Sequence, residues 1–172
     1  NATARDYPIG TIGRWSSLGQ SWANVGNTPY RYYKNWSYEG GICTPFIAHW
    51  PGTITPNRIT YFKGHFIDIM PTLLELTNSS YPAAFNGEPV NAYDGLSFLP
   101  VLKGEEVKRE KPIFFQWSKG KALISGDWKL VTGSESSWEL YNIKKDKTEI
   151  NNLSETCPAV KDSLISVFYD WY

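Results

Sequence analysis

Four short apolar and aromatic stretches follow one another in the last third of the chain, and they constrain its fold more than any other feature. Breaks that contain glycine separate them, and Gly126-Asp127 has the composition of a tight hairpin turn. Short β-prone runs joined by such turns predict an antiparallel meander with one covered face. The predicted strands are residues 112–117, 122–125, 128–131 and 138–143.

The end of the chain predicts a helix that covers this sheet. Apolar residues recur there at helical spacing, and Pro158 suits the first turn of a helix. A helix with one apolar face needs a surface to pack against, and the sheet supplies one. We therefore predict a small α+β subdomain over residues 105–172. The apolar helix face consists of Val160, Leu164, Val167, Phe168 and Trp171.

Upstream of this subdomain the pattern differs and indicates the edge of an α/β domain. Residues 43–50 form a short, mostly apolar run, which favours a buried strand of a parallel or mixed sheet. Residues 64–77 have helical periodicity, with a kink or restart expected at Pro71. A short helix is also expected at residues 97–103, and the aromatic-rich stretch 15–33 is expected to be an ordered loop.

Composition argues against two kinds of partner. The 172 residues carry 17 basic and 17 acidic side chains, whereas nucleic-acid binding draws on a basic excess. No apolar run approaches the roughly 18 residues of a membrane-spanning helix. The chain begins without methionine, so we expect a mature product or, given the motifs below, a piece of a longer chain. Whether Cys43 and Cys157 pair is open at this stage.

The stretch from residue 32 to residue 45 holds the most informative charged side chain. Lys34 is the only lysine or arginine between Arg31 and Arg58, and aromatic residues flank it. The Gly40-Gly41 pair downstream permits unusual backbone angles and close backbone contacts. An ammonium held on such a loop suits an oxyanion. The alternative is a surface lysine whose stem packs on an aromatic ring.

This stretch resembles a segment of the type I sulfatase, or arylsulfatase, family of the alkaline-phosphatase-like superfamily. The shared pattern is Lys34, four residues, Glu39-Gly40-Gly41, a branched residue, two variable residues and Pro45. Further blocks agree with the family in order and spacing, so the resemblance spans residues 14–172. These blocks are residues 65–76, 93–97, 126–131, 139–143 and 148–153.

The resemblance implies an alkaline-phosphatase-like fold in the complete enzyme, with residues 1–104 as the C-terminal part of its catalytic domain. The family's nucleophile is a formylglycine made from the Cys or Ser of a C/S-x-P-x-R motif. Cys43-Thr44-Pro45 begins similarly, but Ile47 stands where arginine is required, so Cys43 is interpreted as structural. The nucleophile and the ligands of the family's Ca²⁺ are expected upstream, with no metal ligand in this segment, and the isolated segment is predicted to be inactive.

Within this chain the resemblance assigns a catalytic role to Lys34. In the family that lysine contacts the sulfate oxygens, and its charge offsets the charge on the sulfuryl group. Trp117, Lys119 and His65 are further candidates for substrate binding. Many relatives carry a pocket-facing histidine in the strand near Trp117, but residues 114–121 contain none, so Trp117 or Lys119 is expected to line the pocket instead. His65 is also suited to structural capping duty, because it heads a predicted helix.

The resemblance also implies two structural roles. Glu39, Gly40 and Gly41 are expected to shape the loop around Lys34 rather than to touch substrate. Asp68 is expected to brace the helix in which it lies.

The leading hypothesis is a sulfuric-ester hydrolase that acts on aryl or carbohydrate sulfate esters. A phosphoester or phosphonate hydrolase of the same superfamily is an alternative, since it also needs oxyanion stabilisers. A non-catalytic carbohydrate-binding module is another, because 16% of the residues are aromatic. For the sulfatase, the expected partners are the sulfated substrate and the N-terminal part of the same enzyme. The family also implies export to the periplasm, the lysosome or the extracellular space.

Overall fold

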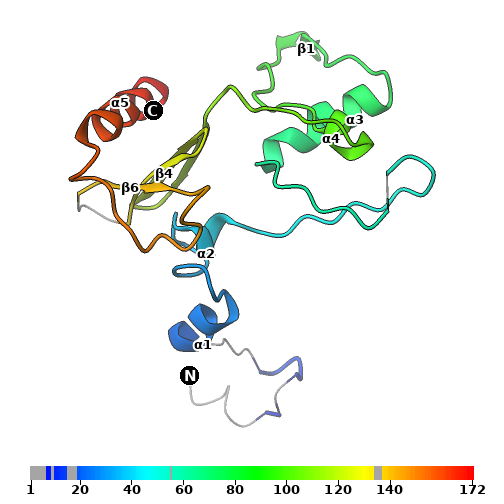
Figure 1. Ribbon diagram of the computed structural model, residues 1–172. Coiled ribbons are helices and arrows are strands. Elements are labelled where there is room, and N and C mark those ends of the chain that lie inside the picture. Colours follow the sequence, from blue (N-terminus) through cyan, green and yellow to red (C-terminus); the bar gives the residue numbers. More distant parts are fainter. Residues whose placement is uncertain (1–6, 9, 15–18, 55, 134–136) are drawn as a thin grey trace. The chain divides into compact units, whose positions relative to one another are not determined.

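The computed structural model describes the chain except residues 1–6, 9, 15–18, 55 and 134–136 (Figure 1). The chain forms two compact units. One combines Asn1–Cys43 with Phe114–Tyr172, and the other is Thr44–Ile113. The segment around Lys34 thus belongs to the same compact unit as the C-terminal sheet. A division into residues 1–104 and 105–172 stays a prediction about the domains of the complete protein.

The first unit is built on the predicted sheet. Strands β3 (Ile113–Trp117), β4 (Gly120–Ser125), β5 (Trp128–Thr132) and β6 (Glu139–Asn142) lie in that order, and β5 is antiparallel to both of its neighbours. Ser125 and Trp128 pair across a tight turn in which Gly126 has a φ of +54°. Glycine adopts this left-handed conformation without steric cost. The four-stranded antiparallel sheet is confirmed.

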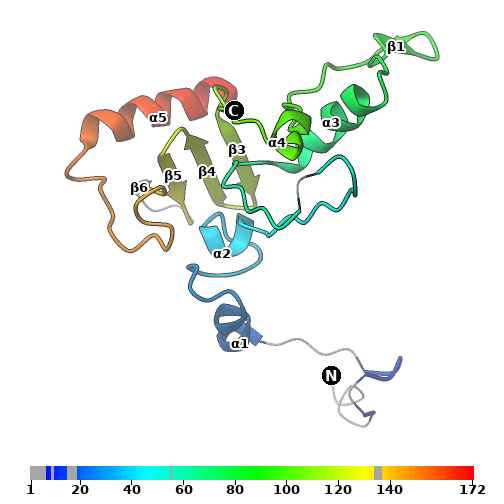
Figure 2. The ribbon, with the colours of Figure 1, turned by 45° about the vertical axis from the view of Figure 1, so that its right-hand side comes forward.

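Helix α5 (Pro158–Trp171) covers one face of the sheet, as Figure 2 shows. Pro158 lies in the first helical turn, where backbone N–H groups have no partner within the helix, so the absence of an N–H on proline costs no hydrogen bond. The rings of Phe114 and Trp171 stack with centroids 4.5 Å apart and extend the contact. The predicted α+β fold with a C-terminal helix is therefore confirmed. The shared core consists of Leu123, Leu130, Leu140, Leu164 and Phe168.

The other face of the sheet carries α2 (Glu39–Ile42), and Figure 2 shows α2 and α5 on opposite sides of the strands. Successive side chains of a strand point to opposite faces. Leu130 accordingly packs in the core with α5, whereas Lys129 reaches Glu39 at the start of α2. Tyr141 of β6 is paired with Lys129 and shares its face.

Upstream of α2, the stretch predicted to be an ordered loop contains helix α1 (Gly19–Gly26). The loop prediction is therefore wrong for these residues, while residues 15–18 lie outside the described part of the chain. Every residue of α1 is at least partly exposed. Its glycines and asparagine have low helix propensity, which hid the helix from a reading of the sequence.

The second unit contains two helices that match the predictions. The predicted helix at residues 64–77 is a 3₁₀ turn, η2 (Phe66–Asp68), followed by α3 (Ile69–Leu76). The restart places Pro71 in the first turn of α3, where proline is tolerated. Helix α4 (Leu99–Lys103) corresponds to the short helix expected at residues 97–103. Strands β1 (Ala84–Phe85) and β2 (Glu88–Pro89) form a small antiparallel hairpin.

Asp68 holds this unit together from the start of α3, as expected for a residue that braces the helix. Its buried carboxylate accepts hydrogen bonds from the backbone N–H groups of His65 (2.7 Å) and Leu96 (2.8 Å). It also forms an ion pair with Arg109. One side chain thereby joins three separate segments of the unit.

Residues 43–50 do not form the predicted strand and are irregular instead. Phe46 and Ile47 are exposed, although the ring of Phe46 lies 5.5 Å from that of Phe98. A strand needs a neighbour that satisfies its backbone groups, and the described residues supply none for this run.

In the part of the chain that the structure describes, no helix has both the length and the apolar composition needed to cross a membrane.

Candidate functional site

Lys34 lies in an exposed turn of the loop between α1 and α2. We call residues 31–38 the lysine loop. Among the described residues, no hydrogen bond or ion pair to the Lys34 ammonium is found. The lysine loop therefore presents a cation that is available to an anionic ligand.

The lysine loop has an unusual backbone on both sides of Lys34. Tyr32 has a φ of +62° and Asn35 a φ of +80°. Asparagine tolerates this left-handed region, but a tyrosine adopts it only when its surroundings enforce it. A hydrogen bond of 3.1 Å from the N–H of Trp36 to the carbonyl of Tyr33 closes the turn.

The two glycines of α2 allow the lysine loop to pack directly on the helix. A Cβ atom on Gly40 would lie 2.1 Å from the carbonyl oxygen of Tyr32, and one on Gly41 would lie 1.9 Å from that of Trp36. The N–H of Gly40 also donates to the carbonyl of Arg31 at 2.9 Å. These contacts exclude any side chain at the two positions, which agrees with the loop-shaping role expected for the Glu-Gly-Gly sequence.

A buried ion-pair cluster anchors α2 to the sheet. Lys129 Nζ lies 2.7 Å from Glu39 Oε1 and 2.7 Å from Glu149 Oε1. The N–H of Glu39 donates to Glu149 Oε2 at 2.8 Å. The side chains of Lys129 and Glu149 are fully buried, and burial raises the pKa of the Glu149 carboxyl. The cluster is therefore a structural connection rather than a ligand site.

A second network holds the start of the lysine loop. Arg31 donates to Glu139 at 2.8 Å and to the hydroxyl of Tyr141 at 2.9 Å, and its guanidinium lies 4.4 Å from the centre of the Tyr38 ring. The Tyr38 hydroxyl donates to Glu139 at 2.8 Å. Burial alone would raise the pKa of Glu139, but hydrogen bonds from Tyr141, Tyr38 and Arg31 lower it below the ordinary value.

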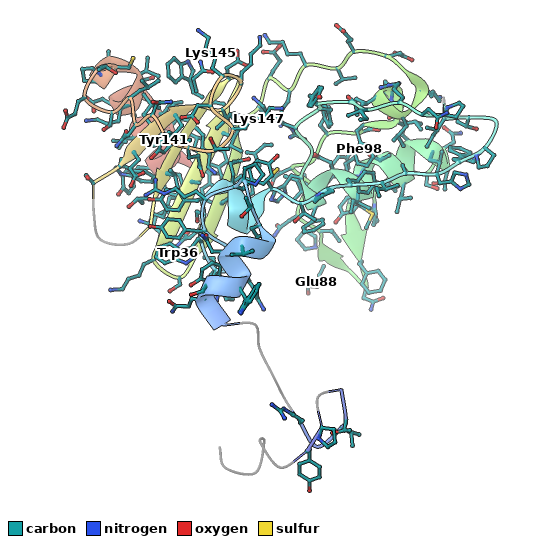
Figure 3. All side chains as sticks on the ribbon, turned by 60° about the horizontal axis from the view of Figure 1, so that its bottom comes forward. Trp36, Glu88, Phe98, Tyr141, Lys145 and Lys147 are labelled. Carbon is teal, nitrogen blue, oxygen red and sulfur yellow. The ribbon has the colours of Figure 1, made fainter. Side chains whose placement is uncertain are left out.

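Aromatic stacking fixes the middle of the loop. The rings of Tyr32 and Trp36 stack with centroids 4.5 Å apart. Figure 3 shows the labelled Trp36 beside the strands, and a Cβ atom on Gly133, just after β5, would lie 3.0 Å from its indole. The aromatic residues that flank Lys34 in the sequence thus support the loop.

The structure brings the segment that holds Trp117 and Lys119 close to the lysine loop. Trp117 is the last residue of β3 and Lys119 lies in the turn that follows, both are exposed, and 65% of the Trp117 surface is accessible. At the end of this turn, a Cβ atom on Gly120 would lie 2.9 Å from Ser37 Oγ. Trp117 and Lys119 therefore belong to a segment that neighbours the lysine loop, and their role in substrate binding stays a prediction.

His65 lies in the other compact unit, where it caps η2. Its Nδ1 accepts a hydrogen bond of 3.3 Å from the N–H of Ile67, which requires an unprotonated nitrogen. Burial lowers the pKa of His65 and favours this neutral form. The contact is the capping duty considered from the sequence, and a role in substrate binding stays a prediction.

Both cysteines are free. Cys43 follows α2 as its C-cap, and its N–H donates to the carbonyl of Glu39 at 2.8 Å. In the described ranges, no three His, Cys, Asp or Glu side chains gather as a metal site.

Apart from Glu39, the charged residues that hold the lysine loop were not identified from the sequence. Lys129 and Glu139 lie within predicted strands, where a charged residue is usually read as solvent-facing. A signal existed for Lys129, because it stands between Trp128 and the apolar pair Leu130-Val131. Its partners at Glu39 and Glu149 are distant in the chain, and no local pattern connects them.

Comparisons with known proteins identify the family of the chain. Residues 29–165 match the family model described as "N-sulphoglucosamine sulphohydrolase, C-terminal". An uncharacterised sulfatase of Schizosaccharomyces pombe is 30% identical over 171 residues, which cover 93% of this chain and 31% of that protein. The chain belongs to the sulfatase family. The resemblance on which this was predicted is confirmed, and the sulfatase chain corresponds to the C-terminal part of the family.

Other relatives place the sulfatase chain in the same way. A sulfatase of Formosa agariphila is 32% identical over 162 residues, which are 84% of this chain and 29% of that protein. An N-acetylgalactosamine-6-sulfatase of Canis lupus familiaris is 33% identical over 119 residues, which are 67% of this chain and 21% of that protein. The chain thus spans less than a third of the length of these curated relatives.

Solved structures share the fold. Ps i-CgsB matches with a TM-score of 0.73 at 23% identity, over 84% of this chain and 32% of that one. A Bacteroides thetaiotaomicron protein of glycosaminoglycan metabolism matches with a TM-score of 0.63 at 26% identity, over 82% of this chain and 31% of that one.

Proposed function

We propose that the protein to which this chain belongs hydrolyses a sulfate ester, and that Lys34 binds the sulfuryl oxygens during the reaction. The observation that carries the proposal is an exposed ammonium on a loop that two charge networks hold in place, one buried around Lys129 and one partly buried around Arg31. A cation on a rigid loop stabilises charge without reorganising as the reaction proceeds, and such fixed donors often account for a large part of catalysis. Family membership supports the reaction type.

Lys34 supplies one part of this chemistry. Its ammonium offsets negative charge on the sulfuryl group as the ester bond breaks. The formylglycine nucleophile expected for the family would come from residues outside this chain, because the sequence contains no C/S-x-P-x-R motif. We therefore expect the 172-residue chain alone to be inactive.

The described acidic residues near Lys34 do not fit a calcium site. Ca²⁺ takes about six to eight oxygen ligands. Glu39 and Glu149 share Lys129, and Glu139 accepts hydrogen bonds from Arg31 and Tyr38. We propose that the Ca²⁺ of the complete enzyme is held by residues outside this chain.

For the substrate we propose a sulfated carbohydrate or an aryl sulfate. An exposed indole at Trp117 offers a face on which a sugar or aryl ring can stack, and Lys119 adds a cation in the turn that follows. Among the structural neighbours, Ps i-CgsB was solved with a neocarrahexaose. That ligand belongs to the neighbour, and it makes sulfated glycans a reasonable first set of substrates to test here.

The remainder of the same protein is the partner that we propose for the second unit. Ile47, Ile59 and Phe66 expose 89%, 81% and 78% of their surfaces. These are only three of the many large apolar side chains that this small unit exposes, and such an accumulation favours a surface that another segment covers. Since the Schizosaccharomyces pombe sulfatase is about three times as long as this chain, the N-terminal part of the enzyme is the expected cover. Export is likewise proposed from family membership alone.

The test uses the full-length protein and compares 4-nitrophenyl sulfate, 4-nitrophenyl phosphate and sulfated oligosaccharides as substrates. Lys34→Ala should lower kcat/KM for the sulfate ester by about 100- to 1000-fold. Lys144→Ala is the matched control, because Lys144 is an exposed lysine of the same unit. Wild-type turnover in Lys34→Ala, or a preference of the native protein for the phosphate ester, would remove the proposal.

A further inference from the structure

The buried cluster of Glu39, Lys129 and Glu149 is connected to Lys34 by a short and continuous path. Lys129 binds Glu39, the first residue of α2. The next residue, Gly40, donates its N–H to the carbonyl of Arg31, and its Cα lies against Tyr32. Each link is a hydrogen bond or a backbone contact with no room for a side chain, so a shift of Glu39 is passed to the lysine loop.

We propose that Lys129 is a positioning residue that sets the place of the Lys34 ammonium by holding Glu39 against the sheet. The inference deepens the proposed function and rests on it. The physical basis of the inference is the charge of the cluster, in which one buried ammonium forms ion pairs with two carboxylates. Without the ammonium the carboxylates of Glu39 and Glu149 would repel each other, and α2 would move away from β5.

The backbone at Glu149 supports this role. Glu149 has a φ of +57°, a conformation that a glutamate seldom adopts. The loop that carries it is fixed by Asp146, whose carboxylate accepts hydrogen bonds from the N–H groups of Ile150 (3.0 Å) and Asn151 (2.7 Å). The chain therefore accepts an unfavourable conformation at the point where Glu149 reaches both Lys129 and the N–H of Glu39.

The sheet offers a matched control for a merely structural effect. Leu130 follows Lys129 on β5, is equally buried, and packs against α5 on the opposite face. Leu130→Ala should weaken the fold without touching the lysine loop. Lys129 variants should instead disturb residues 31–38 specifically.

The experiment measures kcat, KM and amide hydrogen exchange in full-length variants. Lys129→Met should lower kcat for the sulfate ester by about 10- to 100-fold, because small misplacements of a catalytic group cost this much. It should also accelerate exchange in residues 31–42, whereas Leu130→Ala should leave both readouts near the native values. If Lys129→Met fails to fold, Lys129→Met combined with Glu149→Gln keeps the net charge of the cluster and takes its place.

A double-variant comparison separates positioning from other effects. If Lys129 acts through Lys34, Lys129→Met should reduce kcat no further in a Lys34→Ala background. Three results would each overturn the inference. They are full additivity of the kcat losses caused by Lys129→Met and Lys34→Ala, unchanged exchange in residues 31–42 of Lys129→Met, and faster exchange there with native kcat. If the native full-length protein does not hydrolyse sulfate esters, the proposed function is wrong and the inference falls with it. The exchange data would still show whether Lys129 anchors α2.

Discussion

Lys129 Nζ and Glu39 Oε1 lie 2.7 Å apart, although 90 positions separate the two residues in the sequence. The contact joins β5, an inner strand of the C-terminal meander, to the loop that carries the proposed catalytic lysine. It explains why residues 1–43 and 114–172 form one compact unit.

Gly41→Ala should disrupt the lysine loop. The new methyl group would lie 1.9 Å from the carbonyl oxygen of Trp36, and a backbone contact of this kind relieves itself only by moving the loop. We expect a loss of at least about 2 kcal/mol in the free energy of unfolding and lower activity. Thermal unfolding and exchange in residues 31–42 measure the effect. Gly26→Ala is the control, since a methyl group there would meet nothing within 4 Å; equal behaviour of the two variants would refute the contact.

Glu139→Gln should make the protein less sensitive to acid. The pKa of Glu139 is lowered in the folded state, so the carboxylate contributes stability above its unfolded pKa, near 4.5. That contribution is lost as pH falls from 4.5 through the lowered folded value. Unfolding temperatures of the native protein should therefore drop over this range, and the Glu139→Gln variant should show a shallower dependence. Parallel curves for the two proteins would show that Glu139 does not contribute to it.

Arg109→Met should destabilise the second unit. Arg109 pairs with Asp68, and the side chains are 9% and 0% exposed. Removing one member of such a buried pair typically costs about 3 kcal/mol or more, because the other charge is left without a partner. Lys108→Met is the control, because that lysine is 82% exposed. Limited proteolysis within residues 44–113 should be faster in the arginine variant alone.

Trp117→Ala should affect carbohydrate substrates more than small aryl sulfates. Loss of the exposed indole removes a stacking surface worth about 1 kcal/mol, which corresponds to a several-fold rise in KM. The value of kcat for 4-nitrophenyl sulfate should stay near that of the native protein. Trp171→Ala serves as the comparison, because Trp171 is half-exposed but its ring packs on Phe114. An unchanged KM for every sulfated oligosaccharide would show that Trp117 does not contact the substrate.

The C-terminal sheet and helix were predictable because their signals are local. Gly126-Asp127 marks one hairpin, and the spacing of Leu164 and Phe168 marks the buried helix face. The run at residues 43–50 misled for the opposite reason. An apolar run shows that a segment prefers burial, but only a neighbouring strand makes it part of a sheet, and the described residues provide none.

The candidate site was predictable only in part. Lys34 was identified through the Glu-Gly-Gly pattern that follows it, and the structure shows why glycine is needed at both positions. The loop-shaping role of Glu39 was also expected, but the charged residues that pair across the fold were missed because their partners are remote. Arg31 finds Glu139, and Lys129 finds Glu149, across the fold rather than along the chain. Pairing at such distances leaves no periodicity to read.

The two faces of one sheet carry separate tasks, and this has a consequence for protein engineering. Exchanging the C-terminal sheet and helix between related enzymes would keep the sheet face that α5 covers intact. It would mismatch the charged residues on the other face, which hold the lysine loop. A working chimera would have to take residues 31–42 and residues 128–149 from the same parent, although the two segments are far apart in the sequence.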